Sequence, residues 1–157
     1  MRTDKRIFAL GFFDGVHLGH QALLRECCAL AAALEVQPGA ITFLAHPKSI
    51  LLEKPPLLIS TDRDRELLLR AQWALEEKAF DRAAVLLDAA ADHDASQWAY
   101  LRGEAAFGLG LFAQAAEYYR QAEPELPVRV IPRLEHCYLQ LEDYKMAYLY
   151  ASKQKNA

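Results

Sequence analysis

The sequence predicts an α/β unit with an incomplete parallel sheet, followed by an all-α array of repeated helix pairs. Two short apolar runs, 6–10 and 40–43, flank a helical pattern over 21–34, which is typical of a strand, helix and parallel strand. After residue 70 only helical periodicity remains, and the pattern recurs at a fixed step along the chain. We therefore expect one unit over 1–63 and a second over 64–157.

The first apolar run leads directly into a turn that carries two histidines. We expect this run to be a buried strand, and the helix that follows the turn to present its N-terminus there. His17 and His20 are three residues apart, and Gly11, Gly15 and Gly19 allow a close approach of backbone and ligand. Backbone N–H groups and the helix dipole favour an anion at such a turn. The pattern therefore indicates a phosphate site.

The same residues resemble a known family. The segment Gly11-Phe12-Phe13-Asp14-Gly15-Val16-His17-Leu18-Gly19-His20-Gln21, with its His-x-Gly-His motif, is similar to the N-terminal part of bacterial FAD synthetase. That family is the FMN adenylyltransferase of the nucleotidylyltransferase superfamily. Segments 40–48 and 55–68 resemble it too, so that the resemblance covers about residues 7–70.

The resemblance implies a Rossmann-like nucleotidyltransferase unit that uses ATP and FMN as substrates, with Mg²⁺ as cofactor. It implies that His17 and His20 are the catalytic residues that contact ATP phosphates. It also implies a group of residues that bind nucleotide or flavin: Gly11, Phe12, Phe13, Asp14, Gly15, Gly19, Thr42, Phe43, His46 and Pro47. The Ser-Ser-Thr segment with which such enzymes hold ATP does not occur in the 157 residues.

Metal and cysteine chemistry receive less support from the residues. His17 and His20 have no Cys or carboxylate partner placed to complete a zinc site, and we expect no metal centre in the protein itself. Asp14 could bind Mg²⁺ or accept backbone N–H groups in the turn, and we favour the turn. The three cysteines, Cys27, Cys28 and Cys137, share no ligand spacing, and we expect all three to be small buried hydrophobic residues.

The second unit resembles tetratricopeptide repeats, with three helix pairs. Small residues would allow paired helices to approach, while aromatic residues fill the space between successive pairs. Three columns of equally spaced residues carry the pattern and define the repeat step: Phe80, Phe112 and Tyr144; Ala83, Ala115 and Ala147; Leu87, Tyr119 and Ala151. The helix before the first of these columns should begin with Thr61 or Asp62 as its N-cap, run to about Lys78 and serve both units.

Charge and hydropathy exclude several classes of function. The formal net charge is −3, and neither half has the excess of Lys and Arg typical of nucleic-acid binding. No apolar run approaches the ~20 residues of a membrane helix, and the first residues do not form a signal peptide. We therefore expect a cytoplasmic protein with neither nucleic acid nor membrane as a partner.

Three functions stay open at this point. The first is an FMN adenylyltransferase-like enzyme that makes FAD from FMN and ATP, with turnover impaired by the missing segment. The second is a tetratricopeptide-repeat module that binds a peptide or protein partner and carries a catalytically silent nucleotidyltransferase remnant. The third is a nucleotide or flavin binder that does not turn over.

Overall fold

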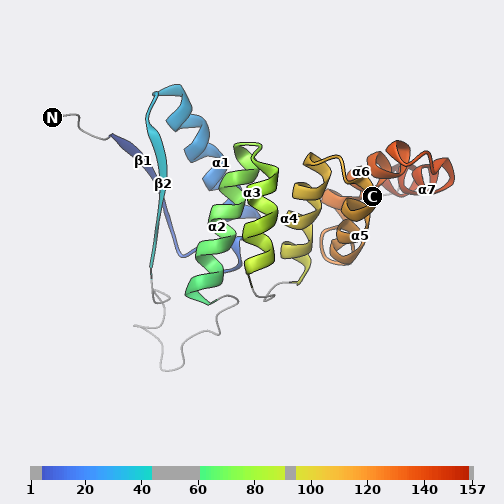
Figure 1. The fold of residues 1–157 in the computed structure, drawn as a ribbon, viewed down its shortest axis with the longest axis horizontal. Helices are drawn as coiled ribbons and strands as arrows, with labels where there is room; N and C mark the ends of the chain where they lie inside the picture. Colours follow the sequence, from blue (N-terminus) through green and yellow to red (C-terminus); the bar gives the residue numbers. More distant parts are fainter. Residues whose placement is uncertain (1–4, 44–60, 91–94, 156–157) are drawn as a thin grey trace.

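The computed structural model describes residues 5–43, 61–90 and 95–155. The described residues form a two-stranded sheet at one end of an elongated molecule, and the helices follow it in sequence order toward the other end (Figure 1). The elements are β1 (Arg6–Gly11), η1 (Asp14–Val16), α1 (Leu18–Ala33), β2 (Gln37–Thr42), α2 (Asp62–Glu76), α3 (Phe80–Ala89), α4 (Ala95–Gly108), α5 (Phe112–Ala122), α6 (Pro127–Gln140) and α7 (Tyr144–Lys155).

The two strands are parallel, as predicted. In their register Arg6 lies opposite Gln37 and Gly11 opposite Thr42. The second strand begins at Gln37, earlier than the predicted start at residue 40, and it includes Pro38. Proline is tolerated because a strand with one neighbour has one edge that needs no ladder hydrogen bond. Pairing with β1 therefore extends the strand through residues that disfavour it locally.

Helix α1 covers one face of this sheet. Ala9 of β1 is buried together with Leu24 and Cys27 of α1. The Cys27 thiol lies 3.5 Å from the carbonyl oxygen of Ile7 and 3.7 Å from that of Gly39, so that it can donate to either strand. This cysteine is a buried packing residue, as predicted.

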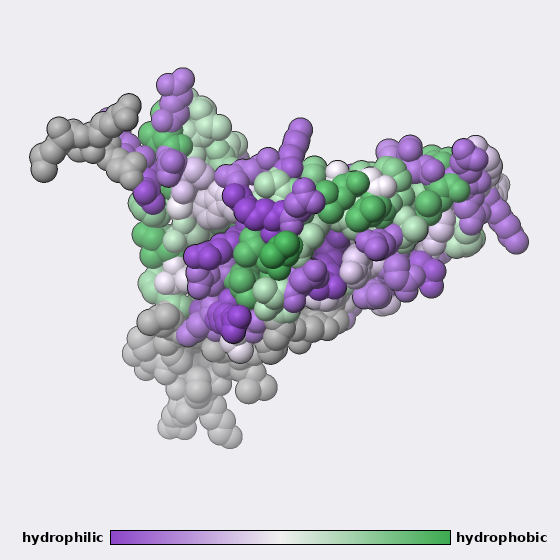
Figure 2. Space-filling view, viewed as in Figure 1, coloured by the Kyte–Doolittle hydropathy of each residue, from purple (hydrophilic) through white to green (hydrophobic). Residues whose placement is uncertain are grey.

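The other face of the sheet is open among the described residues. Its four large apolar side chains are between 44% and 60% exposed: Phe8, Leu10, Ile41 and Phe43. Apolar atoms accordingly lie at the surface of the sheet end of the molecule (Figure 2). The prediction of a buried first strand was therefore wrong for one of its two faces, because within 5–43, 61–90 and 95–155 a single helix, α1, packs on the sheet.

Helix α2 begins where the sequence predicted. Thr61 is its N-cap, and the side chain of Thr61 accepts a hydrogen bond from the backbone N–H of Asp64. The helix contacts α1 and η1 as well as α3 and α4. One helix thus packs against both parts of the molecule, which also agrees with the prediction.

The helical region repeats its geometry at the repeat step of the sequence. Helices α3, α5 and α7 begin at Phe80, Phe112 and Tyr144, and the starts of α4 and α6 are separated by the same step. The turn inside each pair has one residue with positive φ, a conformation that closes a helix with a Schellman motif. These residues are Lys78 (58°), Gly110 (74°) and Glu142 (59°).

Small residues bring the paired helices together. Ala83, Ala115 and Ala147 are buried, as the pattern predicted. A Cβ atom on Gly103 would lie 2.5 Å from Cε1 of the buried Tyr119 ring, so that only glycine fits there. Tyr144 is 67% exposed, which contradicts its predicted packing role, because it lies on the last described helix and no later pair covers it.

The other two cysteines differ in how far they are buried. Cys137 is buried, as predicted, but the prediction was wrong for Cys28, which is only partly buried because it lies beside the covered stripe of α1. Among the described residues no helix has the length and apolar character needed to span a membrane.

Candidate functional site

The turn after β1 is built on two fully buried side chains. Phe13 and Val16 have no exposed surface, and they anchor the ends of η1 in the core. Val16 has a φ of 45°, a left-handed conformation that is costly for a β-branched residue. The buried Gln21 side chain donates from Nε2 to the Val16 carbonyl oxygen at 3.0 Å. This hydrogen bond from α1 holds the turn in place and thereby fixes where the histidines begin.

The two histidines lie together at the N-terminus of α1. His17 is the N-cap residue, and its carbonyl oxygen accepts from the Gln21 backbone N–H at 3.0 Å. The rings of His17 and His20 stack, with centroids 3.7 Å apart and planes at 23°. The His17 ring is exposed and the His20 ring partly buried. The predicted placement of both imidazoles at a helix N-terminus is therefore confirmed.

The environment of His20 keeps its ring neutral near pH 7. Burial lowers the pKa of His20 to about 4, with a further lowering from His17 and an opposing effect from Asp14. The Nδ1 atom of His20 is buried and has no hydrogen-bond partner among the described residues. The Phe13 ring packs against the His20 ring at 5.0 Å between centroids. A buried ring nitrogen without a hydrogen-bond partner costs free energy. A ligand that made this hydrogen bond would therefore gain binding free energy.

Two glycines of the turn lie close against neighbouring aromatic rings. A Cβ atom on Gly19 would lie 3.3 Å from Cε1 of His17, and one on Gly11 would lie 3.2 Å from the Phe13 ring. Thr42 and Phe43, at the end of β2, are both exposed. His46 and Pro47 lie outside the described residues.

Arg65 is a residue of this region that the sequence analysis missed. Its side chain is almost fully buried, donates from Nη1 to the Phe43 carbonyl oxygen at 3.0 Å and lies 4.4 Å above the Phe12 ring. Asp62, one helical turn earlier, lies 3.4 Å from the same nitrogen. Arg65 therefore places a cation where both strands end. It lies in the segment 55–68 that resembles the family, but no local pattern distinguishes it from its charged neighbours.

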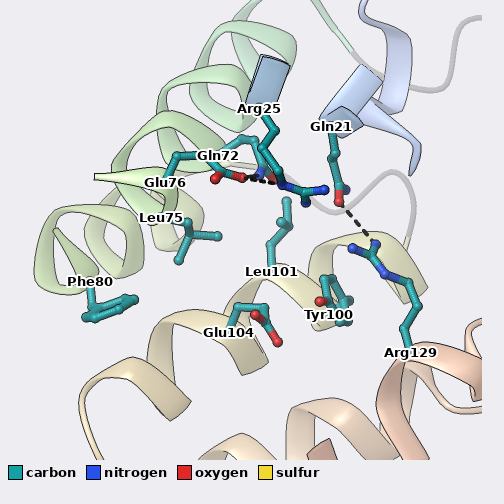
Figure 3. Close-up of a pocket in the computed structure, with 10 residues that line it drawn as sticks. All are labelled: Gln21, Arg25, Gln72, Leu75, Glu76, Phe80, Tyr100, Leu101, Glu104 and Arg129. Carbon is teal, nitrogen blue, oxygen red and sulfur yellow. Dashed lines mark hydrogen bonds and ion pairs between the residues drawn. The ribbon is translucent and has the colours of Figure 1, made fainter. Parts of the chain in front are cut away.

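A polar cavity of about 200 Å³ lies next to the turn (Figure 3). Gln21 lines it, but neither histidine does. The other lining residues come from five helices: Arg25 of α1, Gln72, Leu75 and Glu76 of α2, Phe80 of α3, Tyr100, Leu101 and Glu104 of α4, and Arg129 of α6. No pattern in the sequence indicated it.

Comparison with known proteins agrees with the geometry of the N-terminal half. Residues 1–78 match the family model of FAD synthetase. The bifunctional riboflavin kinase/FMN adenylyltransferase of Listeria monocytogenes is 46% identical over 50 residues, which are 31% of this chain and 16% of that protein. The protein of the same name from Bacillus subtilis is 40% identical over 47 residues, 30% of this chain and 15% of its own length. The chain thus matches less than one fifth of either relative, and no solved structure matches it significantly.

The sheet and its histidine turn lie within the segment that these comparisons match. Residues 1–78, which extend from before β1 to just past the end of α2, are similar to the N-terminal part of FAD synthetases. The short parallel sheet followed by a helical region agrees with the predicted fold class.

Proposed function

We propose that the N-terminal half of the chain performs FMN adenylyltransferase-like chemistry, with ATP and FMN as substrates. The observation that carries the proposal is the pair of stacked imidazoles, His17 and His20, at the N-terminus of α1. Support comes from the family match, since two similar proteins are each named bifunctional riboflavin kinase/FMN adenylyltransferase. A phosphate at this turn would meet helix N–H groups, the positive end of the dipole and two ring donors.

The proposed reaction is an in-line displacement at phosphorus. A phosphate oxygen of FMN attacks the α-phosphorus of ATP, a new P–O bond forms, and the bond to the bridging oxygen of the β-phosphate breaks, so that pyrophosphate leaves. His17 and His20 would donate hydrogen bonds to phosphate oxygens whose negative charge grows in the transition state. No protein nucleophile is needed, and FAD and pyrophosphate are the products.

The unequal burial of the two rings suggests that His17 and His20 have different roles. His17 is exposed and can reach a nucleotide from solvent, whereas His20 is partly buried, neutral and packed on Phe13. A neutral ring donates one hydrogen bond, and the partner that Nδ1 of His20 lacks would come from the substrate or its phosphates. Mg²⁺ would be held chiefly by ATP phosphate oxygens, with Asp14 as the nearby carboxylate, and would neutralise charge on the transferred group.

The helical half is proposed to consist of tetratricopeptide-like repeats. Its support is the recurrence of helix starts and of positive-φ turn residues at the repeat step. Buried alanines at Ala83, Ala115 and Ala147, together with the Tyr119 ring over Gly103, provide the close helix contacts that such repeats use.

Incubation of the full chain with FMN, ATP and Mg²⁺, followed by chromatographic detection of FAD and an assay for pyrophosphate, tests the proposed reaction. We expect His17→Ala and His20→Ala each to lower the rate by about a hundredfold or more, the usual cost of losing a transition-state donor. His136→Ala is the matched control, because this histidine is exposed on α6.

Absence of FAD at high protein concentration, or the same rate for His17→Ala as for the parent chain, would overturn the proposed reaction. Calorimetry with ATP and with FMN then distinguishes the remaining functions. Heat with ATP that His17→Ala abolishes would identify a nucleotide binder without turnover. Absence of heat with both compounds would leave no nucleotide function at this turn.

A further inference from the structure

The cavity between the two parts of the molecule has features of a ligand site that the nucleotide chemistry does not use. It is open to solvent and lined by residues of α1, α2, α3, α4 and α6, so that it exists only when the helical region packs beside the sheet unit. Its volume of about 200 Å³ is below the range of ~300–1,000 Å³ typical of drug-sized ligands. A molecule of only a few heavy atoms fits.

One wall of the cavity carries a buried hydrogen-bond acceptor that has no donor partner among the described residues. Gln72 of α2 is 4% exposed, and its Nε2 donates to Oε1 of Glu76 at 2.9 Å. That bond fixes the orientation of the amide, and the opposite atom, Oε1 of Gln72, is buried without a partner among the described residues. A buried acceptor of this kind costs free energy until an N–H or O–H group reaches it. The ligand should therefore carry a donor.

The opposite wall carries an arginine, Arg129, that has no anionic partner among the described residues. Arg129 of α6 is partly buried, donates from Nη1 to Oε1 of Gln21 at 3.1 Å and lies 4.1 Å above the Tyr100 ring. No carboxylate of the described residues lies within 4.0 Å of Arg129. Figure 3 shows Arg25 and Arg129 reaching toward the same space from α1 and α6. Two converging guanidinium groups suit a carboxylate, which they can bind through several N–H groups.

The two glutamates of the cavity differ in how many further hydrogen bonds their carboxylates can accept. Glu104 is already bound by the Tyr119 hydroxyl at 2.7 Å and by Arg133 at 2.9 Å. Glu76 receives the Gln72 amide, and its only ion pair is with Arg25 Nε at 3.5 Å, among the described residues. Glu76 therefore retains acceptor capacity beside the unpartnered oxygen of Gln72, and together they form a place for an ammonium group.

We propose that this cavity binds a small zwitterion, an α-amino acid, with its ammonium group at Gln72 and Glu76 and its carboxylate at Arg25 and Arg129. Such a ligand supplies both missing partners at once. It also leaves the net charge of the cavity unchanged, as a site with balanced charges requires. A simple anion would satisfy Arg129 alone, and a simple amine would satisfy Gln72 alone.

Calorimetry and thermal unfolding of the full chain, with each of the twenty common L-amino acids as probe, test this proposal. We expect at least one amino acid to bind and to raise the unfolding temperature. The corresponding acid without the amine, and the amine without the carboxylate, should each bind at least tenfold more weakly. Arg25→Met and Gln72→Met should weaken amino-acid binding by about tenfold or more.

The variants are chosen so that the chain still folds. Arg25 has a side chain that is 57% exposed, and methionine has nearly the shape of the glutamine that it replaces at Gln72. Arg70→Met is the matched control, because Arg70 is also an exposed, ion-paired arginine but does not line this cavity. His17→Ala should leave amino-acid binding unchanged, which separates this site from the nucleotide turn.

Three results would overturn the proposal. The first is the absence of binding by every amino acid. The second is equal binding of the deaminated acid, which would mean a site for anions only. The third is unchanged affinity in both Arg25→Met and Gln72→Met.

Discussion

The sheet unit and the helical stack bury their apolar residues to very different extents. In the stack, Tyr119, Leu87 and Leu134 have no exposed surface, whereas on the outer face of the sheet Phe8 and Leu10 are 51% and 60% exposed. Each inner helix of the stack has a neighbour on both sides, but the sheet has a helix on one face only among the described residues. Parallel sheets normally have both faces covered. The comparison shows that repetition builds a complete core from short elements, while two strands and one helix do not.

The largest expected effect comes from truncating one aromatic residue in each region. Tyr119→Ala should lower the free energy of unfolding by about 3–5 kcal/mol, because it leaves a cavity in the stack. Phe8→Ala should cost less than about 1 kcal/mol, since half of that ring already contacts solvent. Chemical denaturation followed by circular dichroism measures both values. A large cost for Phe8→Ala would mean that the outer face of the sheet is covered in solution.

A second pair of variants compares how the two regions tolerate an added methyl group. The Cβ atom of Gly103→Ala would lie 2.5 Å from the Tyr119 ring, and that of Gly39→Ala would lie 2.5 Å from the Phe8 ring. Tyr119 is fully buried and cannot move, so that Gly103→Ala should destabilise the chain by about 1–3 kcal/mol despite the better helix propensity of alanine.

The partner variant, Gly39→Ala, should change stability by much less, because the exposed Phe8 ring can rotate away. Thermal unfolding of both variants and the parent chain measures the difference. Equal losses for the two substitutions would show that the Phe8 ring is held as firmly as the Tyr119 ring, and would contradict the contrast between the regions.

A further expected effect is a pH dependence that belongs to the histidine turn. The pKa of His20 is about 4 in the folded chain, compared with 6.5 for an unperturbed histidine. Between these values the unfolded chain binds more protons, so that stability falls as the pH is lowered from about 6.5 to 4. His20→Gln should reduce this slope of stability against pH. His136→Gln leaves His17 and His20 in place and should therefore retain the slope. Denaturation midpoints measured across this range test the effect, and an unchanged slope in His20→Gln would exclude it.

Local patterns were sufficient for much of the fold. The N-cap at Thr61 and the parallel pairing of the strands were predicted correctly, and α3, α5 and α7 begin on the predicted column Phe80, Phe112 and Tyr144. The start of β2 was not, because Pro38 and Gly39 disfavour a strand locally and only pairing with β1 extends it. The placement of His17 and His20 at the turn followed from the sequence, but the stacking of their rings and the burial of His20 against Phe13 depend on the folded structure.

The sequence by itself determined the order of the elements, the repeat step of the helical region and the placement of two histidines at a helix N-terminus. These features follow from hydrogen-bond periods, caps and glycines that act over a few residues. Only the tertiary structure decided which face of the sheet is open and which polar groups meet in the cavity. Gln21 and Arg129, whose hydrogen bond joins α1 to α6, are 108 residues apart. Such a contact depends on how whole helices pack, and no local pattern encodes it.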